Sequence, residues 1–91
     1  ERFSFIYGGG GNTSEDVRIV GNRVRNSGDN GIEASGVSDL AIRNNRVRRS
    51  DANGIAVWES EDVRIRNNRV RNSGYNGIDV YGVDDVRITG N

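Results

Sequence analysis

Apolar and polar residues follow one another in a pattern that returns every 23 residues. In the copy that begins at residue 63, Val63 and Ile65 alternate with Arg64 and Arg66, which predicts a strand with one buried and one exposed face. The same apolar pair returns as Val17 and Ile19, as Leu40 and Ile42, and as Val86 and Ile88. A fixed period of about 20–50 residues indicates an array in which each copy is one turn of a stack.

The rest of each copy predicts two further short strands. Val70 lies between two Arg residues, and Ile78 and Val80 alternate with polar neighbours. The run 72–77 between them is rich in Asn, Ser and Gly, which favour a turn. We therefore expect an all-β parallel β-helix, a solenoid with three strands and three corners in each coil. Its single domain, 1–91, has coils at 17–39, 40–62 and 63–85, an irregular partial coil at 1–16 and the start of another coil at 86–91.

Asparagine returns at the first corner of every coil. Stacked at the strand spacing of about 4.8 Å, each side-chain amide can bond to the amides above and below it. The sequence thus predicts a structural asparagine ladder of Asn22, Asn45, Asn68 and Asn91. Two more polar columns are read as corners: Ser27, Ser50 and Ser73, and Asn30, Asn53 and Asn76.

A leucine-rich repeat is the rival fold, because residues 37–47 fit its template of strand residues followed by Asn. Such a repeat needs helical residues with Leu on the return side. Here the return side has the pattern of a turn followed by a strand, and the whole chain has a single Leu, Leu40. This pattern favours the parallel β-helix.

The two ends of the chain depart from the period. Phe3 and Phe5 can occupy the inward places of Ile32 and Ala34, and Gly8–Ser14 is then read as a loop outside the coil. At the other end the period stops within a coil. Since repeat arrays need a polar cap on their terminal coils, we expect either a segment of a longer solenoid or chains that associate head to tail.

Composition removes several classes of function. The 13 Arg balance 13 Asp and Glu, so net charge does not favour nucleic acid or a membrane surface as a partner. The chain has no Cys and no His, which excludes thiolate sites and the commonest general base. No apolar run approaches the roughly 20 residues of a membrane span. We expect no cofactor and no metal.

The exposed residues also form columns. Beside the first strand, Asp16, Asp39, Asp62 and Asp85 form a column next to Arg18, Arg64 and Arg87. Charge neutralisation by the Arg column explains this pattern, and a Ca²⁺ ladder is the alternative. On the second strand the exposed column residues are all cationic, namely Arg23, Arg25, Arg46, Arg48, Arg69 and Arg71. They predict a polyanion-binding face, a soluble surface that guards the sheet edge, or a contact with the acidic columns of a neighbouring chain.

The third strand is the least regular. Its exposed positions and corner supply the candidates for glycan binding or lateral packing: Trp58, Tyr81, Asp79, Glu33 and Glu59. Carboxylates beside aromatic rings suit sugar rings, and Asp79 with Tyr81 and an Arg is a conceivable group for proton abstraction. Exposed aromatic rings serve equally well as packing anchors between subunits. No catalytic residue is assigned.

The runs 44–47, 53–57 and 76–82 resemble the right-handed parallel β-helix repeats of the pectate-lyase-like superfamily, especially secreted polysaccharide C5-epimerases and lyases. The resemblance covers residues 17–91 and implies an extracellular location and an acidic polysaccharide as ligand. The epimerase motif combines Tyr, Asp and His, and this chain has no His. The acidic calcium-binding cluster of the lyases is also not recognisable.

These observations predict a non-catalytic structural unit that stacks end to end with copies of itself in an extracellular fibre or surface layer. One alternative is a fragment of a polyuronate epimerase or lyase that binds an acidic glycan along its outer strands. Another is an engineered repeat protein, because several residue types are missing and the period is regular.

Overall fold

The computed structural model describes residues 5–8 and 14–91, and these residues form strands and turns without any helix. The strands are β1 (Phe5–Gly8), β2 (Ser14–Val20), β3 (Arg23–Ser27), β4 (Ile32–Ser35), β5 (Val37–Arg43), β6 (Arg46–Ser50), β7 (Ile55–Trp58), β8 (Glu61–Arg66), β9 (Arg69–Ser73), β10 (Ile78–Tyr81) and β11 (Asp84–Thr89). Within this part of the chain, no helix is long and apolar enough to cross a membrane.

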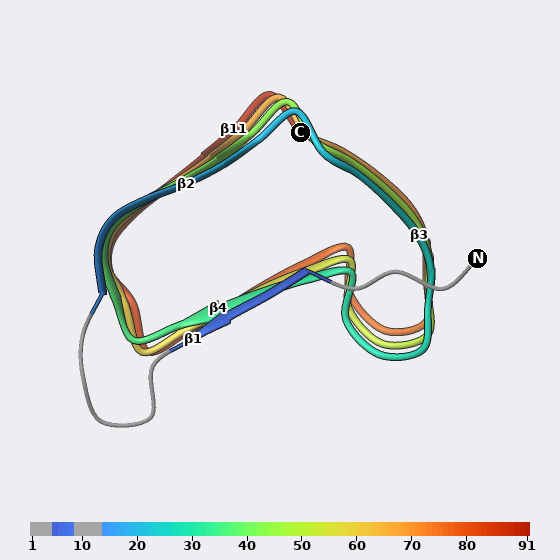
Figure 1. The fold of residues 1–91 in the computed structure, drawn as a ribbon, viewed down its shortest axis with the longest axis horizontal. Coiled ribbons are helices and arrows are strands. Elements are labelled where there is room, and N and C mark those ends of the chain that lie inside the picture. The colour runs from blue at the N-terminus through green and yellow to red at the C-terminus, as the bar shows by residue number, and fades with distance from the viewer. Residues whose placement is uncertain (1–4, 9–13) are drawn as a thin grey trace.

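The strands form three parallel sheets around one core (Figure 1). Sheet A has the order β1-β4-β7-β10, sheet B has β2-β5-β8-β11, and sheet C has β3-β6-β9. From β2 onward, paired residues lie 23 positions apart along the chain, as Ile32 and Ile55 do. This register confirms the parallel β-helix with 23-residue coils. The leucine-rich alternative is wrong, because the return side of each described coil is a strand of sheet A.

The core consists of apolar columns, mostly Val and Ile, that run through all three sheets. Leu40, Val63 and Ile65 on sheet B are completely buried. Their equivalents in the last coil, Val86 and Ile88, are 38% and 45% exposed, because no coil covers them within these 91 residues. Burial therefore depends on having a coil on both sides, as expected when each unit contacts only its neighbours.

Three sheets give each coil the three corners that the sequence predicts, and left-handed residues occupy four columns of the stack. The columns with positive φ are 16, 39, 62 and 85; 21, 44, 67 and 90; 26, 49 and 72; and 36, 59 and 82. The first and third columns lie inside strands of sheets B and C. Asp, Asn and Gly hold most of these positions, since they adopt the left-handed conformation more readily than other residues.

The register of the first strand differs from the predicted one. Phe5 pairs with Ile32 and Tyr7 pairs with Ala34, so the placement of Phe5 at the Ala34 position is wrong, and Phe3 lies outside the described residues. Gly8 and Ser14 belong to strands rather than to a loop. Residues 9–13, also outside the described part, stand where the next coil has only Gly36. An insertion of this length hides the period from the sequence pattern.

The Gly of an Asn-Gly-Ile turn packs closely against the next coil where one is present, as at Gly31 and Gly54. A Cβ atom built on Gly54 would overlap Val70 Cγ1 and lie 2.7 Å from the carbonyl oxygen of Gly77. At Gly77, in the last coil, the nearest atom to such a Cβ is Val70 Cγ1 at 3.8 Å. The 2.7 Å separation at Gly54 is too short for a Cβ atom, whereas the 3.8 Å separation at Gly77 is an ordinary van der Waals contact.

Replacement of Gly54 by Ala should therefore destabilise the protein by about 1–3 kcal/mol through overpacking. Gly77→Ala is the matched control, because it makes the same chemical change at an uncovered position and should be close to neutral. Urea unfolding followed by circular dichroism measures both. Equal losses of stability in the two variants would contradict the close approach between coils.

Candidate functional surfaces

The predicted asparagine ladder is present at the corner between sheets B and C. The backbone N–H and the Nδ2 of Asn45 both donate to Oδ1 of Asn68, each at 2.9 Å. Its Nδ2 also donates to the carbonyl oxygen of Ile19 at 2.9 Å. Asn22 and Asn68 bond upward to Asn45 and Asn91 in the same way. The amides thus satisfy buried backbone groups, which explains why Asn occupies this column.

Asn45→Ala should cost about 2–4 kcal/mol, because it leaves several buried polar groups without partners at roughly 1–3 kcal/mol each. Asn91→Ala removes equivalent hydrogen bonds at an exposed position, where water replaces them, and should cost less than about 1 kcal/mol. Thermal and urea unfolding distinguish the two variants. A loss at Asn91 as large as that at Asn45 would show that burial does not determine the strength of the ladder.

The Ser and Asn columns on the turn between sheets C and A differ from coil to coil. Ser27 Oγ donates to the carbonyl oxygen of Asn30 at 2.7 Å, whereas the hydroxyl groups of Ser50 and Ser73 are buried without a partner. Asn30 Oδ1 accepts the N–H of Asn53, and Asn30 Nδ2 donates to Oε1 of Glu33 at 2.6 Å. Glu33, a candidate for glycan contact, is therefore already bonded to its own turn.

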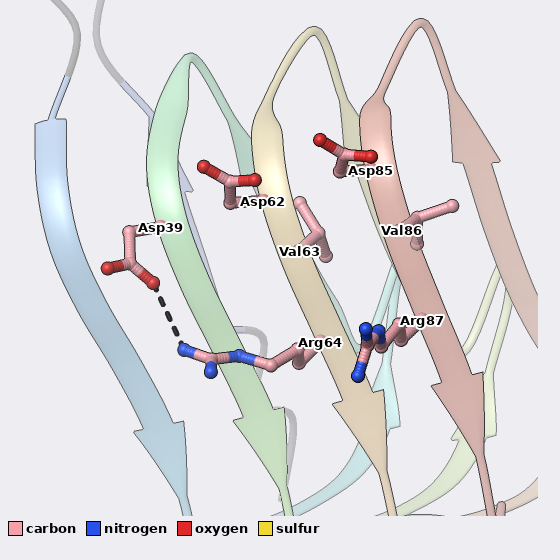
Figure 2. Close-up of a pocket in the computed structure, with 7 residues that line it drawn as sticks. All are labelled: Asp39, Asp62, Val63, Arg64, Asp85, Val86 and Arg87. Carbon is pink, nitrogen blue, oxygen red and sulfur yellow. Dashed lines mark hydrogen bonds and ion pairs between the residues drawn. The ribbon is translucent and has the colours of Figure 1, made fainter.

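The backbone conformation explains why Asp occupies its column on sheet B, which the sequence pattern did not reveal. All four Asp residues have left-handed φ, between 51° and 64°. Figure 2 shows three of them on successive strands beside Arg64 and Arg87, where they line a shallow hollow. Arg64 Nη2 lies 3.1 Å from Asp39 Oδ1 and joins one coil to the next.

Within residues 5–8 and 14–91, this Arg64–Asp39 contact is the only ion pair. The same part of the chain has no group of three acidic residues close enough to hold a metal ion. Neutralisation by Arg is thus visible at Asp39, and the described geometry offers no support for a Ca²⁺ ladder.

Asp16 carries the clearest electrostatic consequence of this column. Its hydrogen bond and charge repulsion with Asp39 raise the pKa of the Asp16 carboxyl above its ordinary value, and Glu15 adds to the shift while Arg18 opposes it. A raised pKa means that folding disfavours the carboxylate. The contribution of Asp16 to stability is therefore greatest below its unfolded pKa and is lost as pH rises through the folded pKa.

Asp16→Asn should raise the melting temperature at neutral pH, because it removes this repulsion and Asn keeps the left-handed backbone. The gain over the wild type should shrink as pH falls through the pKa of Asp16, and should also shrink at high salt. Asp16→Ala removes the same charge but disfavours the backbone conformation, so it should be less stable than the Asn variant. A gain that does not change with pH would contradict the electrostatic cause.

The Arg columns line two shallow hollows on neighbouring sheets. On sheet C, Arg23, Arg25, Arg46 and Arg48 surround Val24. On sheet B, the second hollow is lined by Arg18, Ala41, Arg43, Arg64 and Arg66. Arg69 and Arg71 extend the sheet C columns by one coil, in register with Arg46 and Arg48. The predicted cationic face therefore continues around the corner onto sheet B.

The remaining candidates gather on sheet A. Trp58 pairs with Tyr81, and Tyr81 is 72% exposed. Asp79 and Glu33 both pair with Ala56 from opposite sides, and Ala56 is fully buried although it faces outward in the strand pattern. Binding of an acidic glycan by these residues stays a prediction.

Glu59 and the suggested catalytic group are also placed by sheet A. Glu59 lies at the left-handed corner after Trp58, and its N–H donates to the carbonyl oxygen of Tyr81 at 3.0 Å. Asp79 and Tyr81 lie on one strand, but β4, β7 and β10 contain no Arg. Strands β4, β7 and β10 therefore do not supply the Arg that the suggested proton-abstraction group needs.

One structural residue escaped the sequence pattern. Ser60 occupies the inward column of Val37 and Val83, where it is 4% exposed. Its Oγ donates to the carbonyl oxygen of Trp58 at 2.9 Å and accepts the N–H of Val37 at 3.1 Å. The 23-residue offset from two Val residues is the signal that identifies it.

Comparison with known proteins agrees with this geometry. A family model described as "right handed beta helix region" matches residues 4–91. Among proteins with curated descriptions, none matches the chain.

Proposed function

Because the chain belongs to the right-handed β-helix family, we propose that it is a non-catalytic structural solenoid whose C-terminal face binds a further coil, supplied by a second copy of the chain. The observation that carries this proposal is the exposure of Val86 and Ile88, 38% and 45%, at positions that are completely buried in the preceding coil. Covering these side chains removes apolar surface from water, which favours association.

The same face presents open hydrogen-bonding edges. β9, β10 and β11 are the last strands of their sheets, so one edge of each has no partner strand among the described residues. Exposed strand edges pair readily with other chains. Apolar side chains and free backbone groups therefore act together at one face.

A second copy stacked head to tail offers matching groups. In the repeat register, Asn22 of the second copy stacks on Asn91 in the same way as Asn45 stacks on Asn22 within one chain. Arg18 of the second copy then has the same position relative to Asp85 as Arg64 has relative to Asp39, with which it forms an ion pair. The ladder and the ion pair would both continue across the junction.

The sheets differ in how they meet at such a junction. Among the described residues, sheets A and B have four strands each, whereas sheet C has three. In continuous register, no described strand of the second copy therefore lies directly on β9. We expect sheets A and B to make the contact, with β1 on β10 and β2 on β11.

Ile88→Arg tests the proposal, because it places a charge in the centre of the contact without disturbing a buried position. We expect the wild type to sediment above the monomer mass at high concentration and to form linear particles in negative-stain images, and the variant to associate at least about tenfold more weakly, since about 1.4 kcal/mol corresponds to that factor.

Val20→Arg is the matched control. Val20 is 40% exposed on the outer side of β2, in the column where the next two coils have Arg43 and Arg66. This variant should associate as the wild type does. A wild type that stays monomeric at every concentration, or an Ile88→Arg variant that associates normally, rejects end-to-end stacking.

A further inference from the structure

Positive and negative charges are completely separated within each coil. Residues 18–27, 41–50, 64–73 and 87–91 contain twelve Arg and no acidic residue. Residues 14–17, 28–40, 51–63 and 74–86 contain twelve Asp and Glu and no Arg. A chain with zero net charge therefore carries an arginine face and a carboxylate face, defined by these two sets of segments.

The fold places the densest parts of these faces on opposite sides. The arginine face covers sheet C and the adjoining half of sheet B. Carboxylates gather at the turn from sheet A to sheet B, where Glu59, Glu61 and Asp84 line a hollow. In Figure 1, sheet C (label β3) and this turn lie at opposite ends of the coil.

These charges have little compensation within the molecule. Arg64 and Asp39 form the only ion pair in the described part of the chain. Like charges repeat without interruption along the Arg23, Arg25 and Asp16 columns at about 4.8 Å, where neighbours repel by on the order of 1 kcal/mol in water. A partner of opposite charge with the same spacing relieves this repulsion on every coil at once.

We propose that two copies of this chain bind side by side with parallel axes, the arginine face of one against the carboxylate face of the other. Both faces follow the same strand spacing, and every coil supplies at least one Arg and one carboxylate, although the carboxylate positions other than the Asp16 column differ from coil to coil. Since the faces lie on opposite sides, the operation that relates the copies is a translation. Such a contact does not close on itself and builds an open-ended row.

A second copy fits these charges better than a nucleic acid or an acidic polysaccharide does. Either polyanion would neutralise the arginine face and leave the carboxylate face unmatched, whereas a second copy matches both. The arginine segments also contain no Phe, Trp or Tyr, and binding of single strands relies on aromatic rings that stack on bases. The lateral contact is independent of end-to-end stacking, because it uses the sides of the coils.

A charge-swap experiment tests this contact in the Ile88→Arg variant, in which end-to-end stacking is blocked. One protein also carries Arg23→Glu, Arg46→Glu and Arg69→Glu, and the other carries Glu15→Arg, Glu61→Arg and Asp84→Arg. All six positions are exposed and lie outside the left-handed columns. Circular dichroism establishes that both variants are folded.

Analytical ultracentrifugation at low salt should show association of the Ile88→Arg parent and at least tenfold weaker association of each swapped protein alone. An equimolar mixture of the two should recover the association of the parent, because opposite faces meet again. In 1 M salt, where the Debye length is about 3 Å, all of these complexes should dissociate.

Two results would overturn the lateral contact. One is association of the swapped proteins alone that equals that of the parent. The other is a parent that stays monomeric at low salt but is retained on an alginate column, with retention lost in the Arg-to-Glu protein. That second result would assign the arginine face to an acidic polysaccharide. Loss of end-to-end stacking in the wild type, by contrast, leaves the charge-swap result unaffected.

Discussion

Parallel hydrogen bonding between equivalent residues of successive coils is the constraint on which this structure depends. It places each residue about 4.8 Å from its equivalent 23 positions away, and every side chain therefore meets a copy of its own column. Apolar columns gain from this arrangement, because like packs on like at every level. Buried polar columns favour side chains that can both donate and accept, whereas exposed columns of like charge carry a cost in repulsion.

The Asn column and the Asp column meet this constraint in different ways. An Asn side chain can donate and accept along the same line, so Asn45 bonds to the coil above and accepts from the coil below. Asp cannot do this, and its column remains for another reason: Asp39 and its equivalents bend sheet B in a left-handed conformation. The cost appears as the raised pKa of Asp16 beside Asp39.

The periodic part of the fold was predictable from sequence, because residues of the same kind recur at each coil position every 23 residues. The inward columns, the Asn ladder and the parallel register all follow from that repetition. Where the period is broken, prediction failed: residues 9–13 offset the first strand, and Phe5 lies two positions from its predicted place. The strand of each coil that forms sheet A was predicted from the sequence. The burial of Ala56 and the hydrogen bond between Asn30 and Glu33 were not, because they depend on a turn whose path the pattern does not specify.

Charge separation follows from the same stacking rule. A column can alternate in sign only if successive coils differ, and a regular repeat makes successive coils alike. Opposite charges must then lie in different columns, and neutrality of the whole chain is reached across the coil and not along it. Arg64 and Asp39 bridge neighbouring columns on sheet B, but Arg46 on sheet C and Glu59 at the far turn are separated by the core. A repeat of this kind therefore combines zero net charge with two strongly charged sides, and its surface electrostatics must be judged column by column.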